Sequence, residues 1–423
     1  MQLQVPHKVG YVPSLSSTQH RIPNTEPRAA IATEPPPLAP SRSAAAAPPE
    51  AVTATVDLDA LRHNAAVLRE RAAPAALMAV VKADAYGHGA LPVVRTLVDE
   101  GVRHFAVARV REGVVLRQAG IDARILVLGA PHPDSLGAYA AHGLDVTVSS
   151  PGIAERVCQH ASAQPLRVHV KVDTGMGRIG LSPAEAPSVL DRLARAPGVT
   201  VAGLWTHFAT ADAPDDPFAR TQRDRFADVL ADVKRVVDRH RVPVHAANTG
   251  ALLTLDAPTG STPPALARTG IALYGWAATP ALSERVDLRP VLRWAASVTH
   301  VKTVAPGTPI SYGSRWTAPR RTRIATLGVG YGDGYPRSAS GRASVRIRGT
   351  RVPIVGTICM DMCMVDLGPP DRSTAQHVQV GDAAVLLGAH GPTAYDVAAW
   401  AGTIPYEVLC GVSPRVPRHY TTA

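Results

Sequence analysis

Cysteine is scarce in this 423-residue chain, which holds only Cys158, Cys359, Cys363 and Cys410. Four cysteines spread this widely do not form the disulfide framework of a small secreted protein. Cys359 and Cys363 lie four positions apart, but no second pair stands at metal-ligand spacing, so we expect neither a zinc site nor another bound metal. The scarcity predicts reduced thiols in a cytoplasmic protein.

Long apolar runs and aromatic residues are also lacking. No run reaches the ~18 apolar residues that a membrane helix requires, and the N-terminus has neither the charged start nor the apolar stretch of a signal peptide. The net charge is +10, yet aromatics make up only 4% and do not alternate with basic residues as in proteins that stack on bases. We therefore expect no membrane or nucleic-acid partner, and a positive charge that suits anionic small molecules.

Lysine is rare beside arginine. Only five of the 44 Lys+Arg residues are lysine, namely Lys8, Lys82, Lys171, Lys234 and Lys302. Lys82 ends an apolar run, in the segment Val80-Val81-Lys82-Ala83-Asp84-Ala85-Tyr86-Gly87-His88-Gly89. Arginine stays protonated, whereas a lysine amine loses its proton when buried and forms Schiff bases. This pattern indicates that Lys82 performs chemistry that arginine cannot perform.

The first 50 residues differ in composition from the rest of the chain. They contain ten of the 38 prolines, the run Pro35–Pro37 and the run Ala44–Ala47. Such a composition cannot build a core, so residues 1–50 are predicted to be a disordered leader. An over-extended start site is the alternative interpretation.

Short β-type runs alternate with amphipathic helical stretches from residue 76 onward. Eight strands alternating with helices predict a parallel (β/α)8 TIM-type barrel over residues 51–287. A doubly wound open sheet is the competing architecture, although no G-x-G-x-x-G follows the first strand. The expected strands are Ala76–Ala83, His104–Ala108, Arg124–Gly129, Asp145–Ser149, Arg167–Asp173, Val201–Phe208, Val244–Asn248 and Thr269–Gly275, and expected helices include Leu91–Glu100, Val110–Ala119, Pro183–Ala194 and Arg220–Arg239.

The pattern changes after about Leu288. Few helix signals remain, and short strands are separated by Gly, Pro and Asp turns. Residues 288–423 are therefore predicted to form a second, mostly β C-terminal domain. Its expected strands are Val291–Val304, Thr322–Gly328, Ala343–Arg348, Val352–Val355, Met362–Leu367 and Ala383–Leu387.

Residues whose side chains can take part in catalysis or binding follow the expected barrel strands, where the active sites of such barrels are built. A lone histidine at a strand end is more often a packed residue, but here five strand ends each carry a candidate functional residue, which favours a site. A lysine, small residues suited to phosphate capture, two arginines and no metal cluster together indicate pyridoxal 5′-phosphate chemistry. The residues are Lys82 with Tyr86, then Lys171, Asp173 and Arg178, then His207, then Asn248-Thr249-Gly250, and finally Arg268-Thr269-Gly270-Ile271.

The segment 80–89 resembles the cofactor-lysine signature of the alanine racemases, the fold type III pyridoxal-phosphate enzymes. The resemblance covers roughly residues 53–412 and implies a barrel followed by a β domain. Asp84 stands where this family often has Asn, and Thr249 where it often has Ser. Further matching motifs are Val170–Gly180, Trp205–Asp212, Arg268–Gly275, Ser311–Gly313, Gly330–Arg337, Gly356–Asp361 and Ile404–Glu407.

The resemblance implies a two-base reaction on alanine. Lys82 would hold the cofactor covalently and act as the base on one face of the α-carbon. Tyr312, from the β domain of the partner subunit, would be the base on the opposite face, in a homodimer with composite active sites, and Tyr331 would line the substrate entrance. Lysine and tyrosine have reference pKa values of ~10.4 and ~10, so both need lowering to act near neutrality.

The resemblance also implies the binding residues. Arg268 would face the pyridine nitrogen, with His207 beside it. Arg178 and the backbone of Met360 would hold the substrate carboxylate, and a carbamylated Lys171 would brace Arg178. The phosphate would be surrounded by Tyr86, Asn248, Thr249, Gly270, Ile271 and Tyr406.

The expected function is alanine racemisation that supplies D-alanine for peptidoglycan. A racemase of serine or of broader specificity is the nearest alternative. A non-catalytic pyridoxal-phosphate carrier would lack the β domain and hence Tyr312, Met360 and Tyr331. A barrel decarboxylase for basic amino acids is a further alternative, but an arginine at the pyridine nitrogen opposes the strong electron sink that decarboxylation favours.

Overall fold

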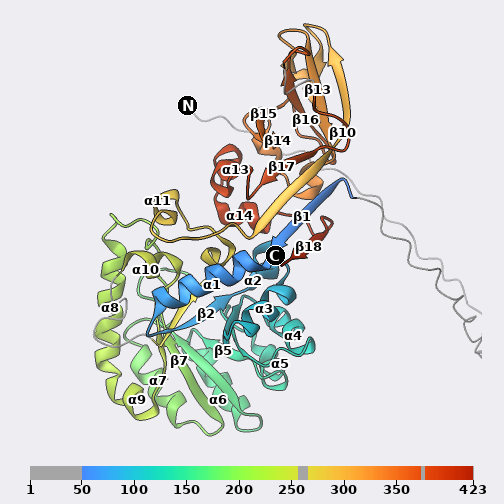
Figure 1. The fold of residues 1–423 in the computed structure, drawn as a ribbon. Helices are drawn as coiled ribbons and strands as arrows, with labels where there is room; N and C mark the ends of the chain where they lie inside the picture. The colour runs from blue at the N-terminus through green and yellow to red at the C-terminus, as the bar shows by residue number, and fades with distance from the viewer. Residues whose placement is uncertain (1–49, 256–264, 373–376, 423) are drawn as a thin grey trace, which may run out of the picture. The chain divides into compact units, whose positions relative to one another are not determined.

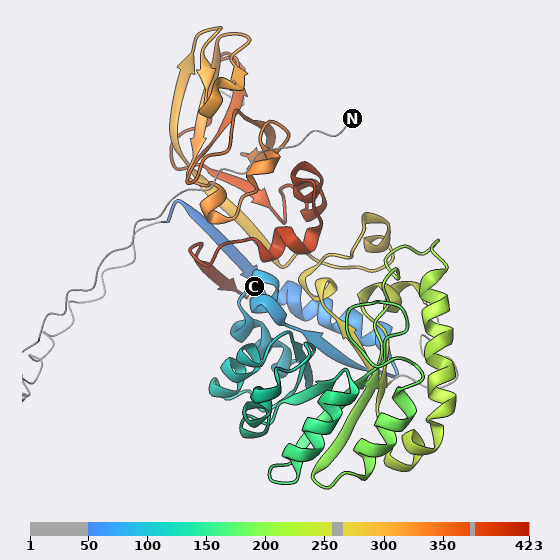
Figure 2. The ribbon, with the colours of Figure 1, turned by 180° about the vertical axis from the view of Figure 1, so that it is seen from behind.

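The computed structural model describes residues 50–255, 265–372 and 377–422. The predicted leader, 1–50, lies outside the described residues except for Glu50. Eight parallel strands form one sheet, and helices lie on its outer side (Figures 1 and 2). Along the chain the strands are β2 (Ala76–Val80), β3 (His104–Val107), β4 (Arg124–Val127), β5 (Asp145–Val148), β6 (Leu166–Lys171), β7 (Val199–Trp205), β8 (Val244–His245) and β9 (Leu266–Thr269).

The sheet closes into a barrel. Strand β9 pairs with β2, the first barrel strand, in parallel register. On its other side, Ala265 N donates to Val244 O at 2.8 Å and Arg268 N donates to Ala247 O at 3.0 Å, which joins β9 to the β8 segment. The barrel prediction is therefore confirmed, and the doubly wound open sheet is wrong, because such a sheet keeps two free edges.

The barrel helices form because their apolar residues recur at helical spacing. In α7 (Ala186–Arg195), the buried residues are Ala186, Val189, Leu190 and Leu193, which make one face. The predicted helix Arg220–Arg239 divides at Val233 into two helices. The others are α1 (Leu58–Ala72), α2 (Lys82–Gly87), α3 (Ala90–Asp99), α4 (Val110–Gln118), α5 (Leu136–Ala141), α6 (Pro151–Ala161), α8 (Phe218–Asp232), α9 (Lys234–His240), α10 (Thr249–Thr254) and α11 (Pro280–Ser283).

The last barrel strand differs from the prediction. The expected strand Thr269–Gly275 is instead the end of β9 followed by a 3-10 helix, η2 (Ile271–Tyr274). All four residues of η2 are buried. A short, wholly buried apolar run has no polar face to reveal its period, so sequence does not separate strand from helix here.

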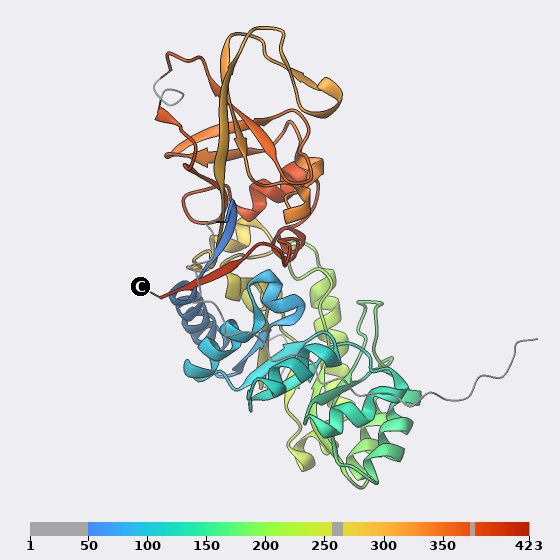
Figure 3. The same cartoon turned by 90° about the vertical axis from the view of Figure 1, so that its right-hand side faces the viewer.

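The second sheet is mostly antiparallel and lies in the C-terminal part. Its longest strand, β10 (Leu292–Val304), pairs with strands on both sides (Figure 3). The predicted β domain is confirmed, although it also carries two helices, α13 (Ala394–Ala401) and α14 (Pro405–Cys410). The other strands of the second sheet in this domain are β13 (Thr322–Leu327), β14 (Ser344–Ile347), β15 (Thr350–Val355), β16 (Cys363–Gly368), β17 (Ala383–Leu387) and β18 (Arg418–Thr421). Strands β11 (Pro309–Ile310) and β12 (Trp316–Thr317) form a separate two-stranded sheet.

Strand β1 (Val52–Asp57) belongs to this second sheet, although residues 52–57 were assigned to the barrel. It pairs antiparallel with β10 and parallel with β18. Its alternate residues Val52, Ala54 and Val56 are buried, as expected of a strand with one covered face.

None of the helices in the described ranges combines the length and apolar character needed to cross a bilayer. Across the same ranges, no three His, Cys, Asp or Glu side chains are grouped to hold a metal ion.

A buried asparagine joins the start of the barrel to the segment that leads into the second sheet. Asn64, on α1, donates from Nδ2 to Leu273 O at 3.0 Å and to Arg289 O at 2.8 Å. Its Oδ1 accepts from Arg289 N at 2.8 Å. One amide side chain thus satisfies three backbone groups on two segments more than 200 positions away.

Replacing this asparagine is expected to destabilise the fold. Asn64→Ala leaves a buried carbonyl at Leu273 and two partly buried backbone groups at Arg289 without partners, and should lower the free energy of unfolding by about 3 kcal/mol in urea titrations. Glu70→Ala, at an exposed position of the same helix, is the control and should change it by less than about 0.5 kcal/mol. Equal effects of the two substitutions would contradict the assigned role of Asn64.

Candidate active site

Lys82 lies at the carboxyl end of β2 and begins an unusual turn. The next four residues, Ala83 to Tyr86, have φ between +53° and +55°, the left-handed region that non-glycine residues rarely adopt. The turn ends where Ala90 N donates to Asp84 Oδ1 at 2.7 Å. Burial, and then the positive charge of Arg178, lower the pKa of Lys82.

A cluster of aromatic rings backs this turn. The buried Tyr86 ring lies 4.9 Å from Tyr274 and 6.2 Å from Tyr406, between ring centroids. His88 packs 4.5 Å from Tyr274, and its Nδ1 lies 2.9 Å from Tyr86 O. Burial lowers the pKa of His88 to about 4. Tyr406 belongs to α14, so the C-terminal β domain contributes a side chain directly to the carboxyl end of the barrel.

Backbone groups gather beside the Tyr86 hydroxyl. A Cβ on Gly270 would overlap Tyr86 Oη, so only glycine lets the strand end approach this closely. Gly270 N donates to Thr249 Oγ1 at 3.3 Å, and Ile271 begins the buried η2. Asn248 caps α10, where its Oδ1 accepts from Ala251 N at 2.9 Å. The six residues predicted to surround a phosphate are thus linked through Tyr86, Thr249 and Gly270.

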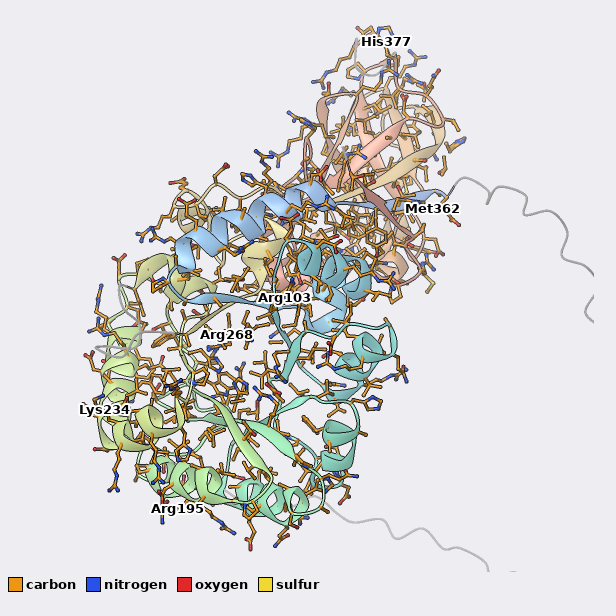
Figure 4. The ribbon with its side chains drawn as sticks, turned by 60° about the horizontal axis from the view of Figure 1, so that its bottom comes forward. Arg103, Arg195, Lys234, Arg268, Met362 and His377 are labelled. Atoms are coloured by element: carbon orange, nitrogen blue, oxygen red, sulfur yellow. The ribbon has the colours of Figure 1, made fainter. Side chains whose placement is uncertain are left out.

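Arg268 is buried, with 3% of its surface exposed (Figure 4). Its Nη1 donates to His245 Nδ1 at 2.9 Å and to His245 O at 3.0 Å. Its Nη2 donates to Thr206 O and Ala246 O, both at 2.8 Å, and lies 3.4 Å from His207 Nδ1. Burial, and then Arg178, lower the pKa of Arg268 to about 9, while burial and then Arg268 hold the pKa of His207 well below its usual value.

Two histidines and an aspartate continue from Arg268 through the barrel interior. His245 Nε2 lies 2.9 Å from His169 Nδ1, and His169 Nε2 lies 3.1 Å from Asp145 Oδ2. Arg268 can only donate, so His245 Nδ1 must accept and its Nε2 must carry the proton. His169 then accepts at Nδ1 and donates from Nε2 to the carboxylate. The row therefore has a single consistent set of tautomers and connects the buried guanidinium to a negative charge.

Lys171, at the end of β6, is completely buried. Its Nζ donates to Ile179 O at 2.7 Å and lies 5.1 Å from the centroid of the Trp205 ring. Burial lowers its pKa to about 8, against the opposing charge of Asp173. Asp173 in turn accepts from three backbone N–H groups of the loop that leads to the exposed Arg178.

Tyr312, Tyr331 and Met360 form a separate surface on the second sheet's part of the chain. They are 72%, 41% and 53% exposed. Their loops are joined, because Thr357 Oγ1 donates to Tyr312 O at 2.9 Å and Gly332 N donates to Met360 O at 2.8 Å. A cavity of about 410 Å³ lies against Tyr312 and Met360. Within the described residues, no hydrogen bond or ring contact connects this surface to Lys82.

Sequence reasoning did not identify Asp145, His169 and His245. A signal was present, because each lies inside a run that was predicted to be a barrel strand. A strand covered on both faces has no exposed side for a titratable residue, so such a residue must have a buried partner. Three such residues in three strands would have predicted a hydrogen-bonded row.

Comparisons with known proteins indicate the same family along nearly the whole chain. Residues 56–278 match the model of the alanine racemase N-terminal domain, and residues 291–420 match that of the C-terminal domain. The alanine racemase of Symbiobacterium thermophilum is 44% identical over 87% of this chain and 96% of its own length, and that of Chlorobaculum tepidum is 42% identical over 89% and 98%.

Solved structures give the same result. The alanine racemase from D-cycloserine-producing Streptomyces lavendulae superposes with a TM-score of 0.80 at 38% identity, over 89% of this chain and 98% of that one. The alanine racemase from Streptomyces coelicolor A3(2) gives a TM-score of 0.78 at 40% identity, over 88% and 98%.

The buried histidines are expected to make the protein sensitive to acid. His88, His207 and His245 have folded pKa values below that of an unfolded histidine, so the unfolded chain binds more protons in this range. Stability is therefore complete above about pH 6.5 and is lost as the pH falls below it, for His88 down to its folded pKa of about 4, by up to about 1.4 kcal/mol per pH unit for each histidine.

His88→Gln should flatten this pH dependence, as measured by unfolding between pH 4 and 7. His390→Gln, at an exposed histidine, is the matched control and should leave the slope unchanged. Stability that rises on acidification would contradict the burial of neutral histidines.

Proposed function

The chain belongs to the alanine racemase family, and from this premise we propose that it interconverts L- and D-alanine with pyridoxal 5′-phosphate at Lys82. The observation that carries the proposal is the position of Lys82, a half-buried amine of lowered pKa at the mouth of the barrel. It lies in the family's N-terminal domain, four positions before Tyr86, whose Oη lies against Gly270. A lysine in this setting is prepared to react with an aldehyde.

The residues present fit this cofactor. Pyridoxal phosphate supplies an aldehyde that bonds to an amine and an aromatic ring that accepts the negative charge left on the α-carbon. Lys82 would hold it. Gly270 leaves no room for a side chain beside Tyr86 Oη, as a close backbone approach to a phosphate requires. The other residues around the phosphate would be Asn248, Thr249, Ile271 and Tyr406.

Arg268 would face the pyridine nitrogen, with His207 beside it. A guanidinium has five donors and no acceptor, so it would donate to that nitrogen and leave it unprotonated. Arg268 would thereby limit how much negative charge the ring accepts, which would disfavour side reactions. The row from His245 to Asp145 keeps the guanidinium oriented, because every proton in it has one position.

Racemisation removes a proton from one face of the α-carbon and returns one to the other face. A single base would have to cross the plane of the substrate, so two bases on opposite faces are simpler. We assign these bases to Lys82 and Tyr312. Since Tyr312 is 72% exposed and has no hydrogen bond or ring contact with the described barrel-mouth residues, the Tyr312 of a partner subunit would complete the site in a homodimer.

The substrate carboxylate would be held by Arg178 and by the backbone of Met360, with Tyr331 at the entrance. Lys171 would brace Arg178 as a carbamate. Its pKa of about 8 leaves a fraction of neutral amine near neutrality. A neutral amine and CO2 form a carbamate with release of one proton, and the product carries the negative charge that an arginine prefers.

The product D-alanine would supply peptidoglycan synthesis in the cytoplasm. The scarcity of cysteine in the sequence supports this location. A racemase of serine or of broader specificity is the alternative, and the same assay distinguishes it.

The chemistry is tested by incubating the cofactor-loaded protein in deuterated water with D-alanine, L-alanine or L-serine. Solvent deuterium should enter Cα of both alanine enantiomers. Lys82→Ala should abolish activity and the absorbance of bound cofactor, whereas Tyr312→Phe should keep the absorbance and lose about 10²- to 10⁴-fold in rate. Activity that survives Lys82→Ala would disprove the proposal, and faster turnover of serine would favour the alternative.

The composite site is tested by mixing subunits. Lys82→Ala and Tyr312→Phe proteins, each inactive alone, are unfolded together and refolded. If each site takes Lys82 from one subunit and Tyr312 from the other, half of the dimers are hybrids and each hybrid keeps one intact site, which restores about a quarter of wild-type activity. No recovery in demonstrated hybrids would place both residues on one subunit.

A further inference from the structure

We propose that Glu112 is a positioning residue for Lys82, which holds the lysine's turn from the neighbouring barrel loop and places a negative charge beside the amine. Glu112 lies in the first turn of α4, after β3, and the motifs that match the family's catalytic residues do not include it. The inference rests on the proposed role of Lys82. Its test requires neither substrate nor turnover.

The carboxylate of Glu112 connects two loops at the barrel mouth. Its Oε1 accepts from Ala83 N at 2.7 Å, the N–H group directly after Lys82. Its Oε2 accepts from Ala108 N at 2.7 Å and from Arg109 N at 2.8 Å, within its own loop. A helix cap needs only the second oxygen. The first oxygen reaches across to the adjacent strand's loop, 29 positions earlier in the chain.

The turn that Glu112 holds is strained. Ala83, Asp84, Ala85 and Tyr86 are all left-handed, a conformation that costs free energy at every residue with a side chain. A strained turn persists only where its surroundings fix it. Its far end is fixed by Asp84 and by the His88 ring. The near end, which sets the direction of the Lys82 side chain, is fixed by Glu112.

The charge of Glu112 acts on the same lysine. Burial and then Arg178 lower the pKa of Lys82, whereas Cys410 and then Glu112 raise it. Glu112 is thus the carboxylate that partly offsets Arg178, and its removal should lower the pKa of Lys82 further. A residue that served only to cap α4 would have no such effect.

Because lysine is rare, the pKa of Lys82 can be measured in the full-length chain. The protein is freed of cofactor, and covalent attachment of pyridoxal 5′-phosphate is followed by absorbance from pH 6 to 10, with Lys82→Arg as the background for the other four lysines. Attachment requires the neutral amine, so the midpoint of the rate profile reports the pKa of Lys82.

Glu112→Gln keeps an oxygen for Ala83 N but removes the charge. Its midpoint should shift to lower pH, because the carboxylate charge that raises the pKa of Lys82 is gone. Glu185→Gln is the matched control, because Glu185 accepts from Ser182 N at 2.8 Å in the loop before α7, a similar helix-start role elsewhere in the barrel. It should leave the midpoint unchanged.

Glu112→Asp keeps the charge and shortens the reach to Ala83. It should keep the wild-type midpoint but attach the cofactor several-fold more slowly, and this result carries the test if Glu112→Gln does not fold. An unchanged midpoint in Glu112→Gln, an equal shift in Glu185→Gln, or a wild-type rate in Glu112→Asp would overturn the inference. Attachment to the wild type no faster than to Lys82→Arg would instead overturn the proposed function, and the role of Glu112 with it.

Discussion

The central constraint in this structure is a positive charge buried inside a parallel barrel. Arg268 has almost no contact with solvent, so its donors must find acceptors in the protein. They find them in His245 and in carbonyl groups at the ends of β7 and β8. Strand β8 is only two residues long, and the carbonyls of its last residue, His245, and of the following Ala246 accept from the guanidinium. The buried charge and the ends of these two strands thus form one hydrogen-bonded unit.

The sequence predicted the fold well where the hydrophobic pattern of a run and its length both indicate a strand. The strand Arg167–Asp173 corresponds to β6, and Val291–Val304 corresponds to β10. It failed where burial is complete, as in Ile271–Tyr274, and where the partner is distant, as in β1. The helices α13 and α14 are short and follow Gly- and Pro-rich turns, so their signal was weak beside that of the strands.

The candidate site was predictable in its positions but not in its contacts. Lys82, Arg268 and Thr249 follow barrel strands, and the strand ends must meet at one face. The packing of Tyr406 against Tyr86 joins residues 320 positions apart, which no local pattern encodes. The contacts of Tyr312, Tyr331 and Met360 were not predictable either, since one sequence does not show whether a side chain joins the site of its own subunit or that of another.

The pairing of β1 with β18 has a consequence for synthesis on the ribosome. Asp57 pairs with Thr421, so the first strand of the second sheet is completed by a strand made about 360 residues later. At 5–20 residues per second this delay is roughly 20 to 70 s. Throughout it, β1 has an unpaired edge attached directly to α1 of the barrel. The nascent chain must therefore keep this edge from pairing with other chains until β18 emerges.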